Sequence, residues 1–221
     1  QGSDEIRKTL NRRAAEILSD GGDAAYREFE KFIGEYDEAV YRCWYMTTVP
    51  PNNRVSEYRL TKEIGKGAFG KVYLAEDQHG NRFAVKVLHE EVRRTPEMLQ
   101  SFRRGVRSMQ ILSRREVTGM VPYREASEIP AFAVMDYVEG PDLTNAVKAH
   151  QVTSWGQKLR ISADLAKIIR GAHMLPERVL HRDIRPSNIM LKDFYVRPDE
   201  WEVVVLDFDL SWHKDASEKS V

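Results

Sequence analysis

The sequence has little of what marks a secreted, membrane-spanning or nucleic-acid-binding protein. Cys43 is the only cysteine, so no disulfide can form within the chain, which suits a reducing compartment such as the cytoplasm. No apolar run approaches the roughly 20 residues that cross a bilayer, and no secretory signal is recognisable. Lys and Arg together number 34, as do Asp and Glu, so no field of one sign points to nucleic acid. We therefore expect a cytoplasmic protein with neither a membrane nor a nucleic acid as partner.

The first 53 residues have a different sequence pattern from the rest of the chain. Residues 1–3 have the sequence of a cleaved-tag remnant, and apolar residues at helical spacing predict helices over most of 4–53, ending in a stiff linker with two prolines. Aromatic residues of the second helix share one face: Tyr26, Phe29, Phe32 and Tyr36. Such a stripe most often packs against its own domain. Self-association through these helices stays an open alternative.

From Tyr58 onward the sequence alternates between strand and helix signals. Apolar alternation between glycine-containing turns predicts strands at Tyr58–Ile64, Lys71–Glu76, Arg82–Leu88, Val121–Ala126, Ala131–Asp136, Ile189–Leu191 and Val203–Leu206. A threonine, a proline and an acid at 95–97 predict the start of a helix that runs to about residue 113. A longer helix is predicted over 154–174, with these residues toward a core: Leu159, Ala163, Ala166, Ile169 and Ala172. The fold class is therefore α+β.

Glycines cluster between the first two of these strands. The run is Gly65, Lys66, Gly67, Ala68, Phe69 and Gly70. Missing Cβ atoms let backbone N–H groups approach phosphate oxygens closely. The same string fits a Rossmann dinucleotide site, but there a helix follows at once, whereas here the chain continues as a strand. A glycine-rich hairpin without a ligand is the plain alternative.

Lys86 lies on the third predicted strand, flanked by apolar residues. Its plain interpretation is a lysine that snorkels from a half-exposed strand. Its functional interpretation is a cation that reaches the α- and β-phosphates of a nucleotide held under the glycine loop. The order of glycine loop and lysine favours the second interpretation.

The strongest signal is the run from His181 to Asn188. It matches H-R-D-x-x-x-x-N at every fixed position, with Asp183 as the acid. A second acid, Asp207, follows directly after an apolar strand. Carboxylate and amide oxygens at strand and loop ends bind hard cations, and a cation is needed because a triphosphate carries dense negative charge. A loop of solvated charges would not place these groups in this order behind the glycine loop and Lys86.

With these motifs in order, the sequence from Tyr58 to the C-terminus resembles the eukaryotic-type protein kinase superfamily. The resemblance implies a bilobal fold: a β-rich small lobe with its hinge over 54–138, and part of a helical large lobe over 139–221. It implies ATP and Mg²⁺ as cofactors and transfer of the γ-phosphate to a protein hydroxyl.

The resemblance also implies a nucleotide site. Residues 65–70 would cover the phosphates and Lys86 would hold the α- and β-phosphates. The adenine and ribose would contact Val72, Ala84, Met135 as gatekeeper, the hinge from Asp136 to Val138, Asp142 and Met190.

The catalytic groups follow from the same resemblance. Asp183 would accept or orient the substrate hydroxyl proton, and Asn188 and Asp207 would bind Mg²⁺. Arg185 stands where serine/threonine kinases usually carry lysine, so it would neutralise the γ-phosphate and favours a Ser/Thr substrate. Arg182 resembles the arginine that contacts a phosphorylated activation segment.

Three departures from the superfamily pattern matter. Asp209 replaces the glycine that ends the metal motif, and it could join the metal shell or repel phosphate. Gly105 stands where a helix glutamate should pair with Lys86, so another acid must orient the lysine. The chain ends at Val221, before the rest of the large lobe, so we expect a fragment that exposes apolar surface on the 154–174 helix.

These departures keep two other functions open beside a protein serine/threonine kinase. One is a pseudokinase-like module that binds a nucleotide and signals through its shape. The other is a small-molecule phosphotransferase, because metal motifs that end in aspartate are similar to those of aminoglycoside and choline kinases.

Overall fold

The computed structural model describes Arg12, Glu16, Glu28, Lys31 and the ranges 53–89, 91–92, 95–128, 131–197 and 200–214. Contacts divide the chain into two units, Gln1–Val55 and Ser56–Val221. The four described residues before position 53 are helical. The predicted tag remnant, the aromatic face and its self-association lie outside the described residues.

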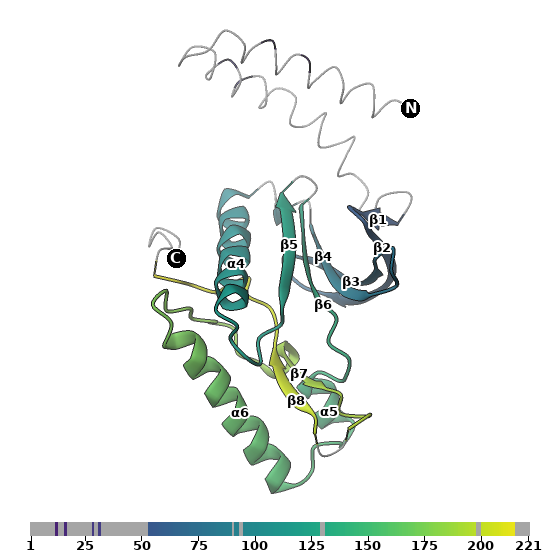
Figure 1. Cartoon of the computed structure of the whole chain (residues 1–221), viewed down its shortest axis with the longest axis vertical. Helices are drawn as coiled ribbons and strands as arrows, with labels where there is room; N and C mark the ends of the chain where they lie inside the picture. Colours follow the sequence, from purple (N-terminus) through teal and green to yellow (C-terminus); the bar gives the residue numbers. More distant parts are fainter. Residues whose placement is uncertain are drawn as a thin grey trace. The chain divides into compact units, whose positions relative to one another are not determined.

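An antiparallel sheet forms the first part of the larger unit (Figure 1). Its strands within this unit are β2 (Tyr58–Lys66), β3 (Gly70–Glu76), β4 (Arg82–Leu88), β5 (Tyr123–Glu128) and β6 (Ala131–Asp136), in the order β2-β3-β4-β6-β5. The short strand β1 (Arg54–Val55) is formed by the last two residues of the smaller unit. β6 is buried over its first five residues, as expected for an apolar strand inside a sheet. The predicted strands were placed within two residues at each end.

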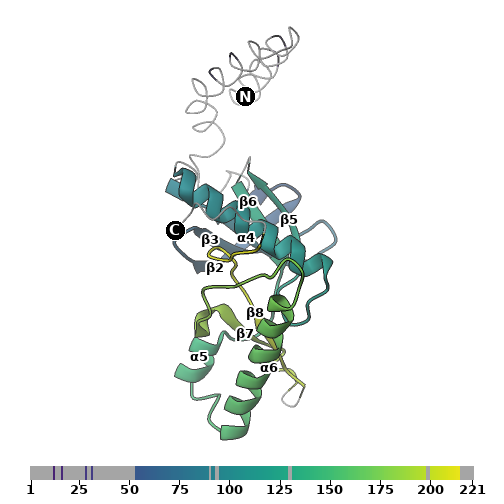
Figure 2. The same cartoon turned by 90° about the vertical axis from the view of Figure 1, so that its left-hand side faces the viewer.

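Helix α4 (Pro96–Arg114) lies along β5 (Figure 2). Proline opens it as predicted, but the Thr95 side chain caps no backbone N–H of the helix. Its hydroxyl donates instead to the Glu91 carbonyl, 2.8 Å away. The buried face carries Phe102, Gly105, Ser108, Met109, Ile111 and Leu112.

Two small residues of α4 let the chain after the last strand pass close by. A Cβ built on Gly105 would lie 2.8 Å from the Phe208 carbonyl oxygen. One turn later, the Ser211 hydroxyl donates to the Ser108 hydroxyl over 2.8 Å, and both serines are fully buried. The helix therefore packs directly on the backbone of residues 208–211.

Replacing Gly105 with alanine is expected to destabilise the protein, although alanine is the better helix former by about 1 kcal/mol. Overpacking against backbone costs about 1–3 kcal/mol, so the free energy of unfolding should fall by about 1 kcal/mol. The matched control is Gly156→Ala in α6 (Trp155–His173), where the nearest atom to the new Cβ is 3.9 Å away. Urea unfolding should show the control to be neutral or stabilising. Equal changes in the free energy of unfolding for the two variants would contradict the close approach of Gly105 to the Phe208 carbonyl.

The second part of the unit holds α5 (Leu143–Lys148), α6, the 3₁₀ turn η1 (Pro186–Asn188) and a hairpin of β7 (Ile189–Lys192) and β8 (Glu202–Val205). Ser154 and Gln157 form a capping box at the start of α6. One apolar cluster runs from the sheet through α4 and α6 to β8. The α+β class is therefore confirmed from Tyr58 onward.

The predicted core face of α6 was wrong in three of its five positions. Leu159 is 65% exposed, and Ala163 and Ala166 are exposed as well. The buried residues are Ile161, Ile168 and Ala172. The helix carries apolar residues on two stripes at helical spacing, and the pattern alone could not decide which one packs inward.

In the part of the chain that the structure describes, every helix is too short or too polar to cross a membrane.

Candidate active site

The glycine run forms the tight connection between β2 and β3. Gly67 donates its N–H to the Gly70 carbonyl over 2.9 Å. His89 holds the same turn down: its N–H donates to the Phe69 carbonyl at 2.9 Å, and its ring lies 3.1 Å from the Gly67 carbonyl oxygen. A strand follows the glycines, so the Rossmann alternative does not apply.

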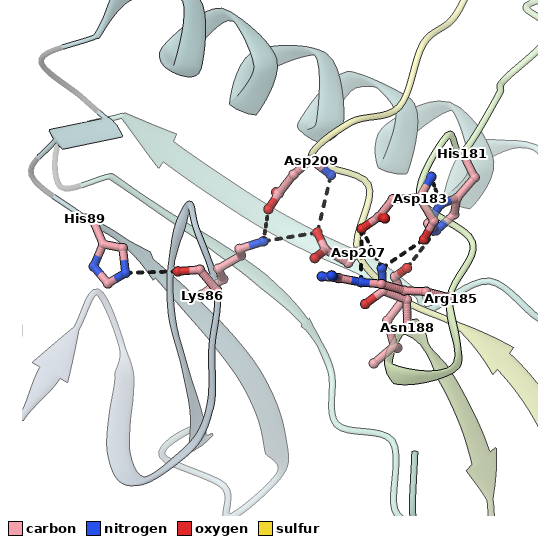
Figure 3. A network of polar contacts seen from close by, with 10 residues as sticks. Lys86, His89, His181, Asp183, Arg185, Asn188, Asp207 and Asp209 are labelled. Atoms are coloured by element: carbon pink, nitrogen blue, oxygen red, sulfur yellow. Dashed lines mark hydrogen bonds and ion pairs between the residues drawn. The ribbon is translucent and has the colours of Figure 1, made fainter. Parts of the chain in front are cut away.

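Lys86 points from β4 toward the chain after β8 (Figure 3). Its ammonium donates to Asp207 Oδ1 over 3.1 Å and also to Asp209 Oδ2. It lies 5.9 Å from the centroid of the Phe69 ring, which belongs to the glycine turn. Only 8% of Lys86 is exposed, so it is not a lysine that reaches out to solvent.

Burial and charge oppose each other in this cluster. Burial acts to lower the pKa of Lys86, but the charges of Asp209 and Asp207 outweigh it, and the pKa is raised. For Asp207, burial acts to raise the pKa, but Lys86 lowers it below its ordinary value. Burial raises the pKa of Asp209 to about 6, against the opposing charge of Lys86. The lysine is therefore charged, and it stabilises Asp207 as a carboxylate.

Asp183 lies beside this cluster in the loop before η1. Asn188 donates through Nδ2 to Asp183 Oδ2 over 2.9 Å and to the Asp183 carbonyl over 3.0 Å. The Asp183 N–H donates to His181 Nδ1 at 3.2 Å, while His181 Nε2 lies 2.7 Å from the Leu206 carbonyl. The backbone N–H of Asp183 can only donate, so Nδ1 of His181 is the acceptor. The Leu206 carbonyl oxygen can only accept, so His181 carries its proton on Nε2. Burial lowers the pKa of His181, which favours this neutral form.

Two arginines flank Asp183. Arg185 Nε lies 3.3 Å from Asp183 Oδ2, so its guanidinium is at the carboxylate. The Arg182 guanidinium lies over the Trp212 ring, with its Cζ 5.9 Å from the ring centroid. Arg182 and Asp207 both have left-handed backbone, with φ of 66° and 61°. Non-glycine residues held in this conformation concentrate at functional sites.

The strand register explains why Asn188 and Asp207 leave the hairpin at the same end. Ile189 pairs with Val205, and the Leu206 N–H donates to the Asn188 carbonyl over 2.8 Å. Asn188 makes both of these side-chain bonds to Asp183 through Nδ2, and its Oδ1 is the side-chain atom that can bind a cation. An amide oxygen and a carboxylate are ligands that Mg²⁺ prefers. The two predicted ligands therefore fit this ion by their chemistry and placement.

The predicted adenine residues share one face of the sheet. Val72 pairs with Lys86, and Ala84 pairs with Met135. Directly paired residues, and residues two apart on a strand, point to the same face. These side chains therefore lie on the face from which Lys86 reaches the acids.

The remaining predicted contacts are placed by the hinge and by β7. Asp142 and Met190 form an isolated β-bridge, which brings Met190 to the exit of the hinge. Asp142 caps α5, accepting the Asn145 N–H at 2.9 Å. Asp136 pairs with Arg124, and Val138 is buried. Asp142 thus has a structural partner of its own beside any ribose contact.

A cavity of about 810 Å³ lies away from the polar network. Asp136 and Val138 line it together with residues of α6 and β8, but Lys86, Asp183 and Asp207 do not. We place the candidate site at the polar network, because its charged and amide groups are those that bind phosphates and metal ions. The size of a cavity alone does not indicate a ligand.

Two members of the site were not predicted in their observed role. For Asp209 the sequence suggested that it could join the metal shell or repel phosphate, but not the contact with Lys86 that the structure shows. The need for a substitute acid, created by Gly105, was the signal that could have identified it. His89 was not singled out at all, and no motif marks it.

Comparison with known proteins gives the family. A model described as the protein kinase domain matches residues 58–220. A probable serine/threonine-protein kinase of Clostridium perfringens is 29% identical over 163 residues, covering 73% of this chain and 22% of the relative. The serine/threonine-protein kinase PknB of Mycobacterium tuberculosis is 30% identical over 151 residues, covering 66% and 23%. CBL-interacting protein kinase 32 of Oryza sativa is 27% identical over 167 residues, covering 75% and 36%.

The chain spans about a fifth to a third of the length of these relatives. The match to the domain model nevertheless covers most of the chain and includes the glycine loop, Lys86, Asp183, Asn188 and Asp207. The chain therefore belongs to the protein kinase family.

Proposed function

We propose that this chain is the nucleotide-binding and catalytic-loop part of a protein kinase that transfers the γ-phosphate of ATP to protein serine or threonine. The observation that carries the proposal is two side-chain contacts near one end of the β7–β8 hairpin: Lys86 binds Asp207, and Asn188 binds Asp183. The backbone bond from Leu206 to Asn188 holds the two contacts beside each other. Residues 54–138 would form the small lobe and hinge, and 139–221 part of the large lobe.

The phosphates would lie between the glycine turn and Lys86. The turn offers backbone N–H groups, and Lys86 offers a buried cation already aligned by two carboxylates. Adenine would lie on the sheet face of Val72, Ala84 and Met135, above Met190 and against the hinge from Asp136 to Val138. Asp142 would contact the ribose in addition to capping α5.

Asn188 and Asp207 would hold Mg²⁺, which neutralises charge on the phosphates when bound. The substrate hydroxyl oxygen forms its bond to the γ-phosphorus as the bond from that phosphorus to the β–γ bridging oxygen breaks. The hydroxyl proton passes to Asp183, and ADP leaves. Arg185 stabilises the negative charge on the transferred group.

The comparisons support serine or threonine as the acceptor, since the Mycobacterium tuberculosis relative is named a serine/threonine-protein kinase and the Clostridium perfringens relative a probable one. Arg185 supports it as well. The cation beside Asp183 occupies the place where serine/threonine kinases carry lysine.

The direct test is transfer of ³²P from [γ-³²P]ATP by the full-length protein. We expect phosphoserine or phosphothreonine after acid hydrolysis of labelled protein, and no label when EDTA removes Mg²⁺. Mg·ATP binding without transfer would instead select the pseudokinase-like module. Label that appears in a small metabolite but in no protein would select the small-molecule phosphotransferase.

A further inference from the structure

Helix α4 carries no acid that could orient Lys86. Its one acidic residue, Glu97, lies exposed in the first turn. The position that a glutamate would occupy is Gly105, and it leaves no room for a side chain. A Cβ there would lie 2.8 Å from the Phe208 oxygen and 3.4 Å from Asp209 Cα.

The space at Gly105 is filled by the segment that carries Asp209. Phe208 and Asp209 lie against the glycine, and the buried bond between Ser108 and Ser211 joins the following residues to α4 about one turn further on. The same packing that excludes a glutamate from α4 therefore holds Asp209 in place.

Asp209 is fixed on both of its polar sides. Its carboxylate accepts from the Lys86 ammonium, and its N–H lies 3.3 Å from Asp207 Oδ1. The side chain is only 14% exposed, so water does not compete strongly for Oδ2. Figure 3 shows the ammonium of Lys86 directed at both acids.

We propose that Asp209 is the positioning residue for Lys86, and that Gly105 is the matching change that makes room for it. The acid has moved from α4 to the segment that also carries the metal ligand Asp207. Alignment of Lys86 then depends on residues 207–211 and not on an acidic side chain of α4. This inference rests on the proposed function, because it assigns the lysine its phosphate-binding role.

A positioning role for Asp209 can be distinguished from a metal-ligand role, because only the positioning role requires Lys86 to be present. A positioning residue acts through the lysine, so its loss should lower kcat and leave the Mg²⁺ requirement alone. A metal ligand acts through the ion, so its loss should be recovered by raising Mg²⁺. A carboxylate that only repels phosphate would give a lower KM for ATP and an unchanged kcat when neutralised.

The test is a double-mutant cycle in the full-length protein with Asp209→Asn and Lys86→Met. We expect Asp209→Asn alone to lower kcat about tenfold, with KM for ATP and the half-saturating Mg²⁺ concentration within about twofold of wild type. In the Lys86→Met background the same change should alter residual ³²P transfer by less than about twofold. The matched control is Glu202→Gln, which neutralises the acid of an exposed pair with Lys192 at 2.9 Å and should leave kcat unchanged.

An unchanged kcat in Asp209→Asn, equal losses in both backgrounds, or recovery by added Mg²⁺ would each overturn the proposal. If transfer by Lys86→Met falls below detection, the Mg²⁺ titration of Asp209→Asn decides. A wild-type protein without any transfer would reject the proposed function itself, which keeps the two failures distinct.

Discussion

Replacing Asp183 with asparagine is expected to lower kcat for phosphate transfer by about 10²–10⁴-fold, the usual contribution of a general base or acid. Asparagine keeps the shape of the side chain, and its amide oxygen can still accept from Asn188 Nδ2, which now donates to Asp183 Oδ2. An amide cannot accept the hydroxyl proton. The loop should therefore stay folded while the chemical step slows.

The measurement is kcat at saturating Mg·ATP, together with the Kd for Mg·ATP by calorimetry. We expect the Kd to stay within about threefold of wild type, because Asp183 is assigned to the hydroxyl and not to the nucleotide. Asp164→Asn is the control: Asp164 forms a surface pair with Lys167 on α6, at 3.2 Å, and its neutralisation should leave kcat unchanged. Equal turnover by wild type and Asp183→Asn would remove the assigned role.

Sequence motifs located the polar network because each motif is local. The H-R-D-x-x-x-x-N run fixes Asp183 and Asn188 five residues apart, and the intervening 3₁₀ turn closes them into hydrogen-bonding distance. Strand alternation placed Lys86 correctly on β4 for the same reason. A strand puts every second side chain on one face, and that rule needs no knowledge of the tertiary fold.

The partner of Lys86 could not be predicted from local pattern. Lys86 and Asp209 are separated by 123 positions in the chain, and their contact depends on how α4 and the chain after β8 pack together. Gly105 indicated that the usual partner was missing, but a glycine in a helix does not say which residue takes the vacated space. The structure supplies that answer through the backbone of Phe208.

The inward face of α6 shows a second limit of the same kind. Leu159 and Ile161 start two apolar stripes on one helix, and both stripes satisfy the helical period. Only the position of α6 against β8 decides that Ile161 and Ile168 are buried and Leu159 is not. The spacing of apolar residues identifies a helix reliably, whereas the side of the helix that is buried depends on the elements packed against it.

Replacing Gly140 with alanine is expected to lower the stability of the protein strongly, although the change adds only one methyl group. Gly140 has a φ of +142°, which L-residues rarely adopt, and a Cβ there would lie 2.0 Å from the Leu191 carbonyl oxygen. The surrounding backbone cannot give way easily. Leu191 donates to the Pro141 carbonyl and Asp193 to the Glu139 carbonyl, each over 2.9 Å, so bonds on both sides clamp the glycine to β7.

Backbone strain of about 1–3 kcal/mol and overpacking of about 1–3 kcal/mol act together at Gly140. We expect the free energy of unfolding to fall by about 3 kcal/mol, which lowers Tm by about 6–12 °C for a chain of this size. Gly80→Ala separates the two causes. Gly80 has a φ of +82°, but no atom lies within 4 Å of a Cβ built there, so only the strain of about 1 kcal/mol remains.

Thermal and urea unfolding of the two variants side by side measure the difference. A loss at Gly140 no larger than that at Gly80 would mean that the chain leaving the hinge is not clamped to β7. The same result would weaken the proposed placement of Met190 beneath the adenine, because the Asp142–Met190 bridge lies next to that clamp in the chain. A large, selective loss at Gly140 would show that the close approach of Gly140 to Leu191 holds β7, and with it Met190, in place.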